Sequence, residues 1–202
     1  MVYLLDDEPE MLKALTRLLH TEGFQVRSFI SVREFLAHER LQQGSACLVL
    51  DVAMPDLNGL QVQERLRQSG AELPIVFLTG HGDIPMSVRA VKAGAENFLT
   101  KPVNAADLLQ AVRAALQRAS DRQVEREERA ALQDRFAQLT PREREVLGHV
   151  IAGKLNKRIA ADLGTGEQNI KIHRGRLMRK LGVRSVAELV RAAERLGVPI
   201  AP

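Results

Sequence analysis

The first 118 residues alternate five times between a short apolar run and a segment of helical spacing, and this pattern limits the fold most strongly. The apolar runs have the length and composition of β-strands. They cover residues 2–5, 25–29, 46–50, 75–78 and 97–100. The helical segments cover residues 9–21, 31–42, 59–69, 84–93 and 103–118. Such alternation predicts an α/β fold, a doubly wound five-stranded parallel sheet with helices on both faces.

The last third of the chain has a different, all-α pattern. Thr140, Pro141 and Glu143 combine a capping box with a proline at the first helical position, so they predict a helix start. Four helices are expected, at residues 141–152, 157–163, 167–181 and 185–196. A Gly-Thr-Gly turn separates the second from the third, and this spacing is typical of a helix-turn-helix.

Residues 119–138 join the two patterns and are charged on all sides. We interpret them as a helical linker that continues the preceding helix. A coiled coil is the alternative, since a heptad seam begins before them at Leu109, Val112, Leu116 and Ala119. Gln123 and Arg126 interrupt that seam. The expected domains are therefore 1–118, the linker 119–138 and 139–202.

The formal charge of +4 is divided unevenly among these parts. Residues 1–118 carry 12 Lys and Arg against 14 Asp and Glu, the linker carries 4 against 5, and residues 139–202 carry 13 against 6. A basic terminal domain predicts binding to nucleic acid. Because only 3% of the residues are aromatic, the chain lacks the stacking platforms that bind single strands, and duplex DNA is the expected target.

Several other classes of protein are disfavoured. No apolar run approaches the roughly 18 residues of a membrane helix, and the acidic residues that follow the first five apolar ones are unlike a signal peptide. The single cysteine, Cys47, excludes a disulfide framework and a multi-cysteine zinc site. We therefore expect a cytoplasmic protein without a membrane partner.

Chemically active side chains follow the ends of four predicted strands. Asp6 and Asp7 follow the first strand, Asp51 the third, Thr79 the fourth and Lys101 the fifth. Carboxylates that meet at one sheet edge repel one another, so a hard divalent cation such as Mg²⁺ is expected there. Each Asp alone would be explained as a helix cap or a solvated loop residue. Together they favour phosphoryl transfer to the Asp51 carboxylate, with the metal and Lys101 stabilising the transferred charge.

These residues lie in four motifs that resemble a two-component receiver domain over about residues 1–118: Leu4-Leu5-Asp6-Asp7-Glu8, Leu50-Asp51-Val52-Ala53-Met54-Pro55-Asp56-Leu57-Asn58-Gly59, Leu78-Thr79-Gly80-His81-Gly82-Asp83 and Phe98-Leu99-Thr100-Lys101-Pro102. The resemblance implies a flavodoxin-like fold in which a histidine kinase phosphorylates Asp51. It implies that Asp7, Asp51 and the Ala53 carbonyl bind Mg²⁺ directly, and that Asp6 binds it through water.

The resemblance also implies a switch pair, Thr79 and Phe98, and a cis Lys101–Pro102 peptide. In receivers, the residues two after the phosphoacceptor and two after the switch Thr flank the water that attacks the phosphoryl group. These are Ala53 and His81 here. Since Ala53 cannot orient a water, we expect no fast self-dephosphorylation. His81 is either a base for that water or an ordinary loop residue.

The helix expected over residues 166–181 is basic and amphipathic, with Ile170, Leu177 and Leu181 on its core side. A basic helix after a tight turn is suited to the major groove, where Gln and Lys recognise base edges and neighbouring basic residues contact phosphates. A solvated basic face is the simpler alternative. The DNA-binding residues that we expect are Asn156, Lys157, Gln168, Lys171, Ile172, Arg174, Gly175, Arg176 and Arg179.

Motifs in this part resemble a LuxR-type helix-turn-helix: Leu139-Thr140-Pro141-Arg142-Glu143-Arg144-Glu145-Val146-Leu147, Asn156-Lys157-Arg158-Ile159-Ala160, Ile170-Lys171-Ile172-His173-Arg174 and Met178-Arg179-Lys180-Leu181-Gly182-Val183. The resemblance implies base contacts at Lys171 and Ile172. Gly166 replaces the usual Ser cap, and Gly175 replaces a basic side chain of some members.

The two resemblances together indicate the FixJ/NarL family of response regulators across the whole chain. They imply a transcription regulator that forms a homodimer and binds an operator when a histidine kinase phosphorylates Asp51, with RNA polymerase as a further partner. A phosphorylation-independent regulator that uses the receiver only for dimerisation is the alternative. A phosphatase of the haloacid-dehalogenase type is disfavoured, because Ala53 stands where that class needs a second Asp, so no turnover enzyme is expected.

Overall fold

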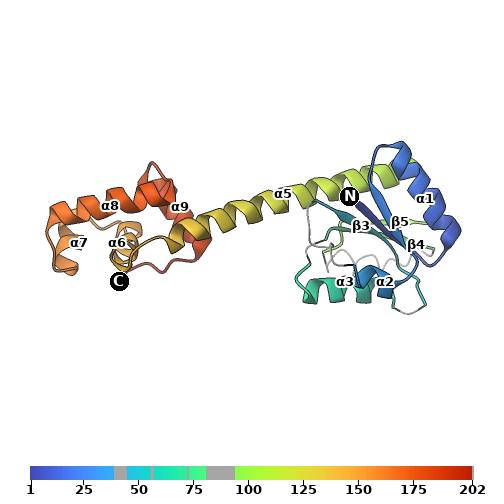
Figure 1. Ribbon diagram of the computed structural model, residues 1–202, viewed down its shortest axis with the longest axis horizontal. Coiled ribbons are helices and arrows are strands. Elements are labelled where there is room, and N and C mark those ends of the chain that lie inside the picture. Colours follow the sequence, from blue (N-terminus) through green and yellow to red (C-terminus); the bar gives the residue numbers. More distant parts are fainter. Residues whose placement is uncertain (39–44, 56, 72, 81–93, 202) are drawn as a thin grey trace. The chain divides into compact units, whose positions relative to one another are not determined.

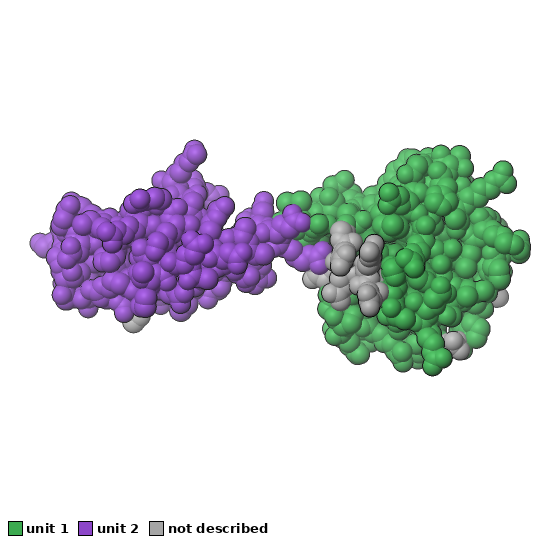
Figure 2. All heavy atoms as spheres, in the orientation of Figure 1, with its two compact units in different colours: residues 1–124 green, residues 125–202 purple. Residues whose placement is uncertain are grey.

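A computed structural model describes residues 1–38, 45–55, 57–71, 73–80 and 94–201. The expected helix over residues 84–93 and the side chain of His81 lie outside these ranges. The chain divides into two compact units, residues 1–124 and 125–202, which are coloured separately in Figure 2. Among the described residues, no helix has both the length and the apolar character needed to cross a membrane.

The first unit contains a five-stranded parallel sheet in the order β2-β1-β3-β4-β5. Its strands are β1 (Val2–Leu5), β2 (Val26–Phe29), β3 (Cys47–Asp51), β4 (Ile75–Thr79) and β5 (Asn97–Thr100). This confirms the predicted doubly wound sheet. In the register of the central pairs, Asp51 lies opposite Leu78, and Thr79 lies opposite Thr100. The carboxyl ends of these strands therefore share one edge of the sheet.

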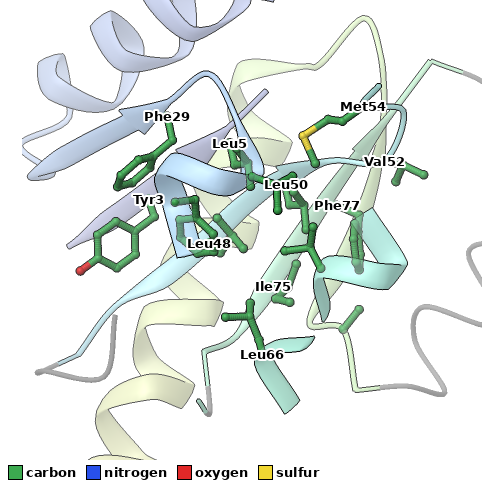
Figure 3. Packing of buried hydrophobic residues seen from close by; sticks show 14 of the residues in the cluster. Tyr3, Leu5, Phe29, Leu48, Leu50, Val52, Met54, Leu66, Ile75 and Phe77 are labelled. Carbon is green, nitrogen blue, oxygen red and sulfur yellow. The ribbon is translucent and has the colours of Figure 1, made fainter. Parts of the chain in front are cut away.

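Helices cover both faces of this sheet (Figure 1). On one face lie α1 (Pro9–Thr21) and the first part of α5 (Ala105–Ala137), and on the other lie α2 (Val32–Leu36) and α3 (Gly59–Gln68). Successive residues of a strand point to opposite faces, so Val49 packs under α1 and α5 while Leu48 and Leu50 pack toward α2 and α3. Figure 3 shows the buried hydrophobic residues on the side of the sheet that faces α2 and α3. The central strands β1, β3 and β4 are buried along their whole length, which explains why they are almost entirely apolar, whereas the edge strands β2 and β5 are partly exposed and include polar residues.

Two local features of the first unit concern where a helix ends and where the next one begins. Helix α2 ends at Leu36 and is followed by a turn in which the His38 N–H donates to the Phe35 carbonyl. Residues 39–42 of the expected helix lie outside the described residues. Helix α3 starts at Gly59, next to the third strand. A Cβ atom on Gly59 would lie 2.9 Å from the Asp51 carbonyl oxygen and 2.9 Å from the Phe77 ring. Only glycine allows α3 to begin this close to the strand.

The second unit contains the end of α5 and four further helices: α6 (Pro141–Ile151), α7 (Asn156–Asp162), α8 (Glu167–Leu181) and α9 (Val186–Leu196). Thr140 and Glu143 form the predicted capping box at the start of α6. The short turn between α7 and α8 gives the predicted helix-turn-helix. Its core includes the fully buried side chains of Ile159, Ile170 and Leu177.

Candidate functional site

Three of the expected site residues meet at the carboxyl edge of the sheet. Asp6, directly after β1, and Asp51, at the end of β3, are 2% and 3% exposed. The Lys101 ammonium lies 2.9 Å from Asp6 Oδ2 and 3.3 Å from Asp51 Oδ2. Burial opposes the charged form of Lys101, but hydrogen bonds and charge from the two aspartates outweigh it and raise the pKa of Lys101 above its usual value. One cation thus holds two buried carboxylates together.

A third carboxylate, that of Glu8, belongs to the same group. Oxygens of Asp6, Glu8 and Asp51 all lie within 4.8 Å of one another, and Glu8 Oε1 lies 3.3 Å from the Lys101 ammonium. Glu8 is the N-cap residue of α1, yet its side chain makes no capping hydrogen bond. Its backbone N–H instead donates to Asp6 Oδ1 over 2.9 Å. Glu8 is not among the site residues predicted from the sequence, although it directly follows Asp6 and Asp7.

Asp7 and Ala53 are placed differently from the residues above. Asp7 is half-buried, and its carboxylate is not in the acidic group formed by the described residues. Ala53 is exposed, and its backbone N–H donates to Asp51 Oδ1 over 3.4 Å. Clustered carboxylate oxygens are the ligands that hard divalent cations prefer. The donor set therefore fits a cation such as Mg²⁺.

The two expected switch residues lie on the neighbouring strands β4 and β5. Thr79, 5% exposed, ends β4, and its backbone carbonyl accepts a 2.6 Å hydrogen bond from the Lys101 N–H. The Lys101–Pro102 peptide is cis. Phe98 in β5 is half-buried, with its ring centroid 6.1 Å from that of Phe77. The backbone thus links the ends of β4 and β5 directly.

The nine expected DNA-binding residues separate into two groups by exposure. Seven are exposed on α7 and α8: Lys157, Gln168, Lys171, Ile172, Gly175, Arg176 and Arg179. The other two, Asn156 and Arg174, are half-buried and bond to each other, with Arg174 Nη1 donating to Asn156 Oδ1 over 2.5 Å. Gly166, the N-cap residue of α8, has no side chain, so α8 begins without a side-chain capping bond.

An ion pair between the buried Glu143 and the partly exposed Lys180 stabilises the second unit. The Glu143 carboxylate lies 2.7 Å from the Lys180 ammonium and also accepts a hydrogen bond from the Thr140 backbone N–H. Burial disfavours ionisation of Glu143, but the bonds from Lys180 and Thr140 outweigh this effect and lower its pKa. The pair joins the start of α6 to the end of α8.

Both halves of the chain match known protein families. A model of the response regulator receiver domain matches residues 2–113, and a model of bacterial regulatory proteins of the luxR family matches residues 137–193. Together these matches account for both units.

Individual proteins match along nearly the whole chain. The response regulator protein TodT of Pseudomonas putida is 43% identical over 195 residues, which cover 96% of this chain and 86% of the relative. The transcriptional regulatory protein FixJ of Azorhizobium caulinodans is 38% identical over 198 residues, covering 98% and 93%. The solved structure of the response regulator StyR is 44% identical, with a TM-score of 0.84, and the match covers 96% of this chain and 98% of that one.

Proposed function

This chain belongs to the DNA-binding response regulators of two-component systems, in which a receiver domain precedes a LuxR-type helix-turn-helix, and from that premise we propose that phosphorylation of Asp51 controls its binding to DNA. These proteins are transcription factors rather than turnover enzymes. The receiver implies a kinase as partner, and the helix-turn-helix implies DNA. We propose a histidine kinase as the phosphodonor and Mg²⁺ as the cofactor.

The contact of Lys101 with both Asp6 and Asp51 is the observation that carries this proposal. The Asp51 carboxylate is the nucleophile, and the Lys101 ammonium, already 3.3 Å away, stabilises negative charge on the arriving phosphoryl group. A bound Mg²⁺, held by Asp51 with Asp6, Asp7 and the Ala53 carbonyl, would add positive charge for the same purpose. The Thr79 hydroxyl then donates a hydrogen bond to the phosphoryl oxygens, and Phe98 moves with it.

We propose that this change at Asp51 shifts the receiver between two states, one of which forms a homodimer. The proposed dimer face consists of β5 and the expected helix over residues 84–93, which lies outside the described residues. A dimer brings two recognition helices to half-sites about one DNA turn apart. Lys171 and Ile172 would contact bases there, with RNA polymerase as a further partner in the cytoplasm.

A comparison of wild type with Asp51→Asn tests this mechanism. Both proteins are incubated with acetyl phosphate and Mg²⁺, and their self-association is measured by sedimentation and their DNA contacts by footprinting. We expect only wild type to dimerise and to protect DNA more strongly after phosphorylation. Equal dimerisation and protection by the two proteins would contradict the mechanism and favour a receiver that serves only as a dimerisation module.

We also propose the domain boundaries 1–118, 119–138 and 139–202. The family matches end at residue 113 and begin again at residue 137, which supports this division. A fragment of residues 1–118 is expected to fold and to accept phosphate from acetyl phosphate. Failure of this fragment to fold, while a fragment of residues 1–138 does so, would move the receiver boundary into the linker.

A further inference from the structure

In α8, the recognition helix of the motif, Arg174 is half-buried, whereas the basic residues Lys171, Arg176 and Arg179 are exposed. An α-helix advances about 100° per residue. On that basis Arg174 lies about 130° from the middle of the exposed row of Gln168, Ile172, Gly175 and Arg179. It lies only about 40° from the middle of the buried row of Ile170, Leu177 and Leu181. Its place in the helix is therefore nearer to the core than to the surface.

The surroundings of Arg174 agree with this geometry. Ile170 and Leu177, one turn before and after it, are both fully buried. A long charged side chain in such a row keeps its charged group near solvent by extending along the core. The Arg174 guanidinium reaches Asn156, the first residue of α7, at 2.5 Å. The exposed Lys171 and Arg179 have no comparable contact with α7 among the hydrogen bonds and ion pairs of the described residues.

We propose that Arg174 and Asn156 are positioning residues rather than DNA contacts, and that their bond fixes α8 against α7. The two helices of this motif have to keep one relative orientation if the exposed row is to enter the major groove. The Leu155 N-cap of α7 makes no side-chain capping bond. The bond from Arg174 therefore restrains the first residue of a helix that lacks a cap. This inference rests on the proposed function of the second unit in binding DNA.

The salt dependence of DNA binding distinguishes a positioning residue from a phosphate contact. Each phosphate that a protein neutralises adds about −0.9 to the slope of log K against log salt concentration. Binding of the full-length chain to a mixed-sequence DNA duplex is measured by fluorescence anisotropy over a range of KCl concentrations. The matched control is Arg179→Ala, which removes an arginine from the exposed row of the same helix.

We expect Arg174→Ala to weaken binding about threefold to tenfold without changing the slope, whereas Arg179→Ala lowers the slope by about one. Arg174→Lys keeps a long cationic donor for Asn156 and is expected to restore most of the affinity. Thermal unfolding of each variant is monitored by circular dichroism. Binding is then compared only at temperatures at which all variants are folded, so that a loss of affinity cannot come from unfolding.

A double-mutant cycle then tests whether the two residues act through each other. If they do, Asn156→Ala combined with Arg174→Ala binds no more weakly than either single variant. Additive losses, or a slope change for Arg174→Ala equal to that of Arg179→Ala, would overturn the proposal. If wild type itself shows no salt-dependent DNA binding, the DNA-binding function fails as well. The two failures are therefore distinguishable.

Discussion

Glu8 adds a further negative charge to the acidic group that it forms with Asp6 and Asp51. Its carboxylate lies within 4.8 Å of theirs, so it raises the local attraction for a cation. We expect Glu8→Gln to raise the Kd for Mg²⁺ about threefold to tenfold, since one nearby charge is lost. Calorimetric titration of the full chain with MgCl₂ measures this change.

Glu10→Gln is the matched control for Glu8, because it removes the same charge two residues later. Glu10 is exposed and pairs with Lys13 at 2.8 Å, away from the acidic group. The Kd of the Glu10→Gln variant for Mg²⁺ is expected to stay within about twofold of the wild-type value. An equal loss in both variants would mean that only the general charge of α1 matters, and not the position of the Glu8 carboxylate.

We expect Ala53 to affect a second property, the lifetime of the phosphorylated state. Its methyl group cannot hydrogen-bond the water that attacks the phosphoryl group, so we expect the aspartyl phosphate to persist for minutes rather than seconds. Ala53→Asn supplies an amide at this exposed position and is expected to shorten the lifetime. Phosphate-affinity electrophoresis after removal of acetyl phosphate gives both rates, and a wild-type lifetime of seconds would contradict this prediction.

Sequence patterns indicated which residues gather at the sheet edge, but not how each side chain is directed. The order of parallel strands places Asp6, Asp51 and Lys101 together in any sheet of this topology. Glu8 was missed because a residue just before a helix is usually explained as part of the helix start. Arg174 was grouped with the expected DNA contacts because the sequence shows its charge. The sequence does not show that its guanidinium donates a hydrogen bond to Asn156.

At the scale of helices and strands, starts were easier to predict than ends. Thr140 accepts a hydrogen bond from the Glu143 backbone N–H, as its capping motif predicts, and Ser31 accepts one from the Glu34 backbone N–H in the same way. The end of α2 at Leu36 has no equivalent signal in the sequence, since neither a glycine nor a proline directly follows it. The central strands were the easiest to find, because burial on both faces makes β1, β3 and β4 almost entirely apolar.

The ion pair between α6 and α8 makes the stability of the second unit depend on pH. The folded pKa of Glu143 lies below its ordinary value of 4.5. The pair therefore stabilises the folded state fully above pH 4.5, and this contribution is lost as the pH falls through the lower, folded pKa. Thermal unfolding of the second unit, followed between neutral and acid pH, should show this loss.

Glu143→Gln is the variant that isolates this contribution. It is expected to cost about 1–3 kcal/mol at neutral pH, because Lys180 loses its charged partner. The difference in unfolding temperature between variant and wild type should shrink in acid, where wild-type Glu143 is also neutral. A difference that stays constant with pH would show that packing, rather than the charge of Glu143, is responsible.

For the whole molecule, the division of charge separates the part that receives a phosphoryl group from the part that binds DNA. The 13 basic residues against 6 acidic ones in residues 139–202 predict that DNA binding weakens steeply with salt. For six or more phosphate contacts, the affinity is expected to fall about a thousandfold between about 50 and 200 mM salt. Anisotropy titrations of the phosphorylated chain measure this dependence, and a flat profile would exclude phosphate contacts as the main source of affinity.

The close approach of α3 to the third strand affects how mutational maps of such a chain are interpreted. Any side chain at Gly59 would collide with the Asp51 carbonyl and the Phe77 ring, both 2.9 Å from a Cβ atom there. In a saturation mutagenesis screen for signalling, Gly59 is therefore expected to tolerate substitution as poorly as Asp51 does. In the proposed mechanism Asp51 carries the chemistry, whereas Gly59 only leaves room for it. Intolerance to substitution therefore does not by itself identify a reacting group.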